Sequence, residues 1–303
     1  MCAGSRCGFL TRVYGAFLGE RTNQVRLVFM DSQVPGLYQT AEAGEAFRVR
    51  IAAIGDLHIR GTEDHRTFPR LSDLPDVADV LVVAGDLTEN GRMLEAEAAA
   101  DLLTAARLPT IAVLGNHDLR TLRRTAFRRV LERRGIEVLE GAGTVLQLAN
   151  GSRVGIAGTT GCGGGFWPQE GPDAIHARTF KRLAIRVSRE CSALEQALLA
   201  LESDVRIATT HFAPTTSTLG REPLAKYWML GNCELGVVLD RCLPDLVIHG
   251  HAHLGTLKGQ TPGGVPVRNV ALPVVGKVHL ETVQPAAVEC ASRVSSAATV
   301  RWT

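Results

Sequence analysis

Six short apolar runs, several of them separated by helical patterns, constrain the fold of this 303-residue chain more than any other feature. Each run ends in glycine or a polar residue, which is typical of buried strands. The runs are 48–55, 79–85, 110–115, 153–158, 205–210 and 246–250. Longer helical patterns occupy 92–107, 119–134 and 180–201. Strands that alternate with helices predict an α/β protein.

Three weaker apolar runs predict additional strands. They cover 136–139, 144–148 and 265–271, and a turn at Pro262, Gly263 and Gly264 comes just before the last of them. Their spacing is close to that of hairpins, which would add antiparallel neighbours to a parallel sheet. We therefore expect mixed sheets that are split into two packed layers.

The composition limits the classes of function. The 33 basic and 31 acidic residues give a net charge of +2, which argues against a broad electrostatic surface for nucleic acid or anionic lipid. Seven scattered cysteines without a Cys-x-x-Cys pair suit a reducing compartment better than a disulfide framework. No apolar run approaches the roughly 18 to 20 residues that a membrane helix needs. We expect a cytoplasmic protein without membrane contact.

The two ends of the chain differ from the central part, and we expect one domain over residues 47–283. Residues 1–46 are rich in arginine up to Met30 and lack the compact apolar core of a secretory signal. They predict an irregular extension, or sequence upstream of a start at Met30, with a transit-like leader as the alternative. Residues 284–303 are dominated by alanine, serine and valine and predict a C-terminal tail.

Nearly every predicted core strand runs into residues that can bind a metal. Active sites of layered α/β folds lie at strand ends because loops converge there. The candidate ligands are Asp56, His58, Asp86, Asn116, His211, His251 and His253. Any one of them alone is most simply a turn residue or a solvated loop histidine. Their shared position at strand exits predicts a metal site.

The number and type of these donors favour hydrolytic chemistry. Seven oxygen and nitrogen donors exceed what one tetrahedral zinc ion requires, but they suit two ions that share a carboxylate. Two metals about 3.5 to 4 Å apart are a recurrent device for hydrolysing phosphate esters. The neutral amide of Asn116 avoids overloading such a site with negative charge. The mixed donors suit Mn, Fe or Zn.

The order of these motifs resembles the calcineurin-like metallophosphoesterase family. The motifs are Asp56-x-His58, Gly85-Asp86, Gly115-Asn116-His117-Asp118, His211 and Gly250-His251-x-His253. The resemblance implies a metallophosphoesterase fold, which is a two-sheet β-sandwich flanked by α-helices. It also implies a dinuclear metal-dependent hydrolase of phosphoric esters. It fades before residue 48 and after about residue 276.

The resemblance implies a role for each residue of the motifs. One metal would be bound by Asp56, His58, Asp86 and His253, and the second by Asp86, Asn116, His211 and His251. A hydroxide that bridges the two metals would attack phosphorus in line, without a covalent phosphoenzyme. His117 would protonate the leaving-group oxygen or steady the developing charge on phosphate, and Asp118 would orient it.

Segments around the motifs have competing interpretations. The glycines of 159–176, with Phe166 and Trp167, predict a substrate lid or equally a surface loop whose aromatic residues pack into the core. The arginine-rich stretch 120–134 is either a solvated helix face or a phosphate-backbone contact. His249 and His279 are expected to be structural. The candidates for gripping a phosphate oxygen are Arg60, His65, Arg66, Arg221 and Lys226.

We predict a phosphodiesterase that acts on a small diester or nucleotide, because neither the size nor the lid offers a long basic groove for a polymer. A phosphomonoesterase acting on a small molecule or phosphoprotein is the second hypothesis. A nuclease and a catalytically silent binding module are further alternatives. Loss of catalysis normally removes ligands or the catalytic histidine, and here every motif is intact. The expected partner is a small phosphorylated substrate rather than nucleic acid.

Overall fold

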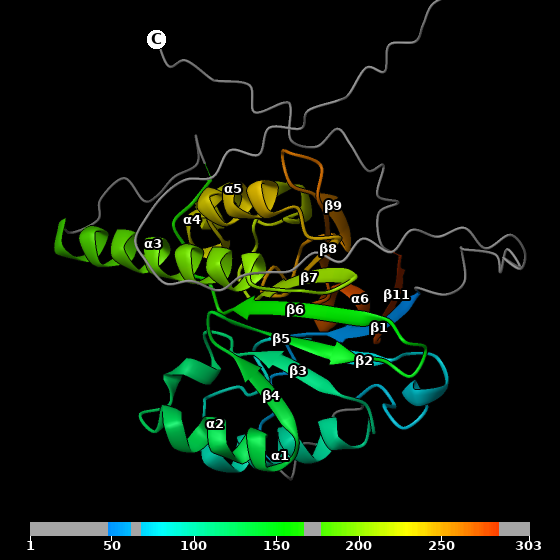
Figure 1. Ribbon diagram of the computed structural model, residues 1–303. Coiled ribbons are helices and arrows are strands. Elements are labelled where there is room, and N and C mark those ends of the chain that lie inside the picture. Colours follow the sequence, from blue (N-terminus) through cyan, green and yellow to red (C-terminus); the bar gives the residue numbers. More distant parts are fainter. Residues whose placement is uncertain (1–47, 62–67, 167–176, 285–303) are drawn as a thin grey trace, which may run out of the picture. The chain divides into compact units, whose positions relative to one another are not determined.

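Two β-sheets pack face to face, with helices on both outer faces (Figure 1). The computed structural model describes residues 48–61, 68–166 and 177–284, which all lie within the unit Glu42–Thr303. The predicted α/β class with two packed mixed sheets is confirmed. No helix in these ranges is both long and apolar enough to span a bilayer.

The first sheet has the strand order β11-β1-β2-β3-β4. Its strands are β1 (Val49–Ile54), β2 (Val80–Ala84), β3 (Thr110–Val113), β4 (Ile136–Leu139) and β11 (His279–Val283). β1 to β4 are parallel, and β11 is antiparallel to β1. Two helices, α1 (Met93–Thr104) and α2 (Arg124–Arg133), form the crossovers from β2 to β3 and from β3 to β4. Parallel neighbours require such crossovers.

The second sheet has the strand order β5-β6-β7-β8-β10-β9. Its strands are β5 (Ala142–Gln147), β6 (Arg153–Thr159), β7 (Val205–Thr210), β8 (Leu246–His249), β9 (Lys258–Gln260) and β10 (Pro266–Asn269). β6, β7, β8 and β10 are parallel, and the two edge strands β5 and β9 are antiparallel to their neighbours. Helices α3 (Ala177–Leu199) and α5 (Cys233–Cys242) pack on its outer face.

Short helical turns complete the described part of the chain. They are α4 (Tyr227–Leu230), α6 (Leu272–Val275) and the 3-10 helices Leu74–Asp76, Asp118–Arg120, Thr216–Thr218 and Leu224–Lys226.

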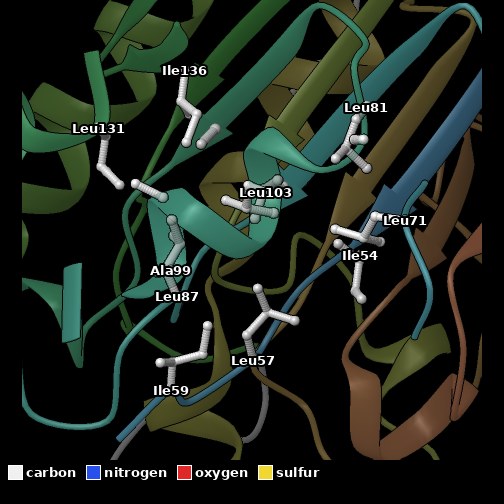
Figure 2. Close-up of a cluster of buried hydrophobic side chains, with 14 of the residues drawn as sticks. Ile54, Leu57, Ile59, Leu71, Leu81, Leu87, Ala99, Leu103, Leu131 and Ile136 are labelled. Atoms are coloured by element: carbon white, nitrogen blue, oxygen red, sulfur yellow. The ribbon is translucent and has the colours of Figure 1, made fainter. Parts of the chain in front are cut away.

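Side-chain alternation along the central strands supplies apolar groups to two separate layers. In β2, Val82 points between the sheets, where it joins Ile207 of β7. Leu81 points the opposite way and belongs to the cluster that also contains Leu103 of α1 and Leu131 of α2 (Figure 2). Because both faces are covered, the central strands are apolar at nearly every position, which is why they stand out in the sequence.

The structure confirms the nine predicted strands but adds elements that the sequence did not suggest. The added strands are β9 and β11, and the added helices include α5. The predicted helix at 119–134 is wrong at its start, because α2 begins at Arg124 and the preceding turn is the 3-10 helix Asp118–Arg120. Leu122, which lies within the predicted helix, is fully exposed. The side chain of Asp118 accepts hydrogen bonds from Leu87 N and Thr88 N in the loop after β2 and so anchors this turn separately from α2.

Candidate metal centre

Four of the predicted ligands have a left-handed backbone conformation. The φ angles of Asp56, His58, Asp86 and His251 are 56°, 46°, 50° and 69°. Only two other non-glycine residues in the described ranges have a positive φ. Such a conformation costs of order 1 to 3 kcal/mol per residue and persists where surrounding contacts enforce it. Its concentration at these strand exits therefore marks a functional site.

Two glycines of the motifs make room for the buried carboxylates. A Cβ atom at Gly115 would collide with the carboxylate of Asp86, and one at Gly250 would collide with that of Asp56. At Gly115 the backbone nitrogen of Asp86 would also be in the way of a Cβ atom. Glycine is therefore required at these positions by the close approach of the carboxylates.

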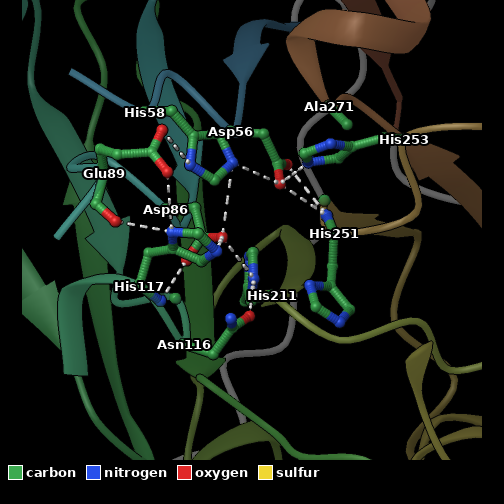
Figure 3. Close-up of polar contacts among 12 residues, drawn as sticks. Asp56, His58, Asp86, Glu89, Asn116, His117, His211, His251, His253 and Ala271 are labelled. Atoms are coloured by element: carbon green, nitrogen blue, oxygen red, sulfur yellow. Dashed lines mark hydrogen bonds and ion pairs between the residues drawn. The ribbon is translucent and has the colours of Figure 1, made fainter. Parts of the chain in front are cut away.

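Asp56, His58 and His253 form a first group of possible metal ligands (Figure 3). Nε2 of His253 donates a hydrogen bond to Oδ1 of Asp56 at 2.8 Å, and Nε2 of His58 lies 3.8 Å from the same oxygen. Nε2 of His58 also lies 3.6 Å from Oδ2 of Asp86. Asp86 is therefore within reach of this group.

Asp86, His211 and His251 form a second group, which comes from both sheets. Nε2 of His211 lies 3.4 Å from Oδ2 of Asp86 and 2.9 Å from Oδ1 of Asn116. The rings of His211 and His251 are 4.8 Å apart between centroids. The structure thus brings all seven predicted ligands into two adjacent groups, with Asp86 between them.

Three backbone carbonyl groups determine which ring nitrogen of three histidines faces the site. A carbonyl only accepts hydrogen bonds, so the nitrogen beside it carries a proton. The contacts are Ala84 O with His211 Nδ1 (2.9 Å), Glu89 O with His117 Nδ1 (2.7 Å) and Met229 O with His251 Nε2 (3.2 Å). His211 and His117 therefore present Nε2 to the site, and His251 presents Nδ1. Outer partners of this kind orient imidazole ligands of metals.

The two groups are electrostatically coupled. Burial would raise the pKa of Asp56, but hydrogen bonding to His253 and His58 outweighs it and holds this pKa well below 3.8. Burial would lower the pKa of His211, yet the charge of Asp86 and the hydrogen bond to it raise the pKa to about 9. Burial and the charge of His211 lower the pKa of His251 to about 3. Anionic carboxylates beside a neutral imidazole are a donor set that fits divalent metals.

Comparison with known proteins shows the family of the chain. The family model of the calcineurin-like phosphoesterases matches residues 49–255. The chain belongs to this family. It is accordingly a metal-dependent phosphoester hydrolase. The match spans both groups of candidate ligands, from Asp56 to His253.

Two of the solved structures that match the chain are named as hydrolases. The phosphopantetheinyl hydrolase of Mycobacterium tuberculosis has a TM-score of 0.53 and 18% identity, over 75% of this chain and 90% of its own. A putative 5'-nucleotidase from Staphylococcus aureus has a TM-score of 0.49 and 14% identity, over 78% of this chain and 53% of its own. At 18% identity the likeness to the phosphopantetheinyl hydrolase concerns the fold alone. None of the curated proteins compared with the chain matches it.

Metal binding to this phosphoesterase is expected to release a proton from His211. The pKa of about 9 means that His211 is protonated at neutral pH in the metal-free protein, whereas a metal ligand must be neutral. The apparent affinity for Mn²⁺ should therefore rise by up to about tenfold per pH unit from pH 7 and level off above about pH 9. Calorimetric titration in two buffers of different ionisation enthalpy counts the released protons. An affinity that stays constant between pH 7 and 9 would contradict this assignment.

Asp118 anchors loops of the phosphoesterase site through four hydrogen bonds. Its carboxylate accepts them from Leu87 N (3.2 Å), Thr88 N (2.9 Å), Thr88 Oγ1 (2.7 Å) and Gly115 N (2.9 Å). Burial and the nearby charge of Asp86 nevertheless raise the pKa of Asp118 to about 6. The side chain ties the loop after β2 to the loop after β3, which carry Asp86 and Asn116.

We expected Asp118 to orient the imidazole of His117, but the two side chains share no hydrogen bond in the structure. None of the four hydrogen bonds of Asp118 goes to His117, because its carboxylate is buried among backbone N–H groups. The carbonyl oxygen of Glu89 holds Nδ1 of His117 instead. Asp118 therefore positions the loop that carries His117 and not the imidazole itself.

Glu89 is a residue of the site that the sequence reasoning missed. Its Oε2 lies 3.6 Å from Nδ1 of His58, and its Oε1 lies 3.7 Å from Nδ1 of His117. With these two histidines it forms a third group that could hold a metal ion. Its position three residues after Asp86, in the same strand-exit loop, was the available indication.

A pocket of about 460 Å³ opens beside the first group of ligands. Leu272 and Pro273 of α6 give it an apolar wall, and Arg60 gives it a cationic one. Of the five candidates for gripping phosphate, Arg60 is the one that lines this pocket among the described residues. Arg221 and Lys226 are exposed elsewhere, and residues 65 and 66 lie outside the described ranges.

For the other segments with competing interpretations, the structure favours structural roles. Phe166 is 4% exposed and packs with Leu219, Leu230 and Ala252, as the core alternative predicted, whereas Trp167 lies outside the described ranges. The arginine-rich stretch is largely a solvated face tied down by ion pairs, such as those of Arg124 and Arg128 with Glu140. The two histidines expected to be structural have local partners. These are Thr218 for His249 and Glu281 for His279.

Proposed function

We propose that this phosphoesterase is a dinuclear enzyme that hydrolyses a small phosphodiester or nucleotide. The observation that carries the proposal is the position of Asp86 between two groups of ligands, with His58 on one side and His211 on the other. A carboxylate in this position suits two metal ions that act together on a phosphate ester. The adjoining pocket of about 460 Å³ has the volume of a small-molecule site.

The ligand sets that we propose are those implied by the family motifs. The first comprises Asp56, His58, Asp86 and His253, and the second comprises Asp86, Asn116, His211 and His251. When bound, the metals would activate a water molecule and neutralise charge on the phosphate oxygens. The oxygen and nitrogen donors fit Mn, Fe or Zn.

The residues of the chain that do not bind metal orient the substrate and move a proton. His117 is held at Nδ1 by the carbonyl of Glu89, so its Nε2 is free of the backbone and serves the leaving-group oxygen. Arg60, on the wall of the pocket, binds a non-bridging phosphate oxygen. The apolar residues Leu272 and Pro273 exclude water from one side of the pocket and contact the organic part of the substrate.

The test is hydrolysis of bis(p-nitrophenyl) phosphate beside p-nitrophenyl phosphate, with chelator-stripped protein refilled separately with Mn, Zn or Fe. We expect metal-restored cleavage of the diester, with kcat/KM at least about tenfold above that for the monoester. A preference for the monoester would replace the proposal with a phosphomonoesterase. Absence of turnover with every metal, when metal is shown to be bound, would overturn it in favour of a binding role.

A further inference from the structure

Arg120 lies directly beside the imidazole to which we assign proton transfer. Its Nη2 is 3.1 Å from Nε2 of His117, and its Nη1 donates a hydrogen bond to Glu89 O at 3.0 Å. The place next to Nε2 is the one that a leaving-group oxygen must reach. A leaving group that enters it therefore meets a guanidinium group as well as an imidazole.

The backbone keeps Arg120 at this place. It ends the 3-10 helix Asp118–Arg120, and its N–H donates to the carbonyl of His117 at 3.2 Å. The first residue of that turn, Asp118, is anchored by four buried hydrogen bonds. The side chain of Arg120 is exposed. The turn is thus fixed while the guanidinium group can exchange His117 for a substrate oxygen.

A second arginine, Arg60, lines the pocket and lies beside Glu89, the residue that Arg120 also contacts. Nε of Arg60 lies 3.7 Å from Oε2 of Glu89, whose carbonyl accepts from Arg120. Glu89 is thereby flanked by two guanidinium groups and contributes one carboxylate. The opposite wall, at Leu272 and Pro273, is apolar. The two guanidinium groups beside Glu89 therefore place positive charge next to His117, where a second anionic group of a substrate could use it.

We propose that Arg120 binds a phosphate in the leaving group, and that the substrate is a diphosphate that is cleaved between its two phosphorus atoms. This inference rests on the proposed function. An alcohol leaves as a strongly basic alkoxide and depends on a proton, whereas a phosphate monoester, with a second pKa near 6, leaves as an anion. A guanidinium group beside the departing oxygen stabilises such an anion through charge-assisted hydrogen bonds.

The reaction consumes one water molecule and yields two phosphate monoesters. A bond forms between the attacked phosphorus and the oxygen of water, and the bond from that phosphorus to the bridging oxygen breaks. The bridging oxygen departs with the electron pair of that bond as part of the second phosphate, which Arg120 holds. One proton from water goes to solvent, and His117, protonated from solvent, gives a proton to the second phosphate where it is needed.

Arg120→Gln in the metal-loaded full chain tests the inference with two substrates. ADP-ribose contains the diphosphate, and the p-nitrophenyl ester of thymidine 5'-monophosphate contains one phosphate. We expect Arg120→Gln to lower kcat/KM by about 10- to 100-fold for ADP-ribose and by less than about threefold for the ester. The kcat/KM of Arg120→Lys for ADP-ribose should lie between those of the wild type and Arg120→Gln, because lysine keeps the charge and lacks the planar guanidinium fork.

Arg123→Gln is the matched control. It removes the same charge three residues further on, from an exposed side chain that has no ion pair within the described residues. We expect it to leave both substrates unaffected. Isothermal titration with inorganic pyrophosphate supplies a readout apart from turnover, and Arg120→Gln should weaken that binding by about tenfold while affecting inorganic phosphate less.

Three results would overturn the inference. The first is an equal loss of kcat/KM with both substrates, which would place Arg120 on the scissile phosphate. The second is no loss of kcat/KM with either substrate. The third is a wild-type enzyme that cleaves the ester but not ADP-ribose. A wild-type protein that cleaves neither substrate would defeat the proposed function. The pyrophosphate titration of wild type against Arg120→Gln would still decide the role of Arg120 in that case.

Discussion

Replacing Asp86 by alanine is expected to lower turnover by about 1,000-fold or more and to remove metal from both groups of ligands. One oxygen of Asp86 faces both groups, since Oδ2 lies 3.6 Å from Nε2 of His58 and 3.4 Å from Nε2 of His211. No other carboxylate within the described part of the chain has this position between the two groups. Elemental analysis of the purified variant and the diester assay measure the two effects.

His117→Ala is the control that separates metal binding from proton transfer. Nε2 of His117 lies 4.0 Å from the same oxygen of Asp86, but His117 belongs to neither proposed ligand set. We expect this variant to retain metal and to turn over about 100- to 10,000-fold more slowly, as loss of a general acid does. Equal loss of metal in the two variants would show that this division of roles is incorrect.

The fold and the grouping of the candidate ligands were predictable because both depend on local sequence patterns. Central strands with both faces covered are continuously apolar, so β1, β2 and β3 are recognisable without knowledge of their neighbours. The polar residue that follows each such strand then lies at its carboxyl end, and parallel strands bring these ends together. His211 and Asp86 follow strands of different sheets, and they meet at 3.4 Å because the two sheets also pack face to face.

The strand, the site residues and the helix boundary that the sequence did not predict depend on contacts between distant segments. β11 pairs with β1 at a sheet edge, and its partly exposed residues give only a weak apolar pattern. Glu89 and Arg120 reach the site because the loop after β2 and the turn after β3 pack on each other. Propensity suggested a helix from residue 119, but the anchoring of Asp118 decided otherwise. Sequence periodicity contains no information about such side-chain to backbone contacts.

Carboxylates hold the strained loops of the site in place. Asp56 accepts hydrogen bonds from His251 N at 3.1 and 2.9 Å, and Asp86 accepts one from His117 N at 2.8 Å. Asp118 makes four such contacts while it binds no metal in the proposed sets. The cost of the left-handed residues is therefore offset by buried hydrogen bonds that also aim the ligands.

Asp118→Ala is accordingly expected to destabilise the metal-free protein by about 2 to 4 kcal/mol. The substitution leaves the N–H groups of Leu87, Thr88 and Gly115 without their acceptor in a buried region. The estimate is smaller than the sum of four bonds because the raised pKa of about 6 shows that burying the charge of Asp118 already costs stability. Thermal unfolding should show a melting temperature lower by about 5 to 15 °C.

Asp73→Ala is the matched control, because it removes a carboxylate from the surface. The side chain of Asp73 is 67% exposed and pairs with Arg70 at 3.8 Å, and such surface pairs contribute about 0 to 1 kcal/mol. If Asp118 positions the loops as we infer, its loss should also weaken metal binding, because Asp86 and Asn116 lie on the two loops that it joins. A variant with unchanged melting temperature but weakened metal binding would instead make Asp118 an electrostatic partner of the metals.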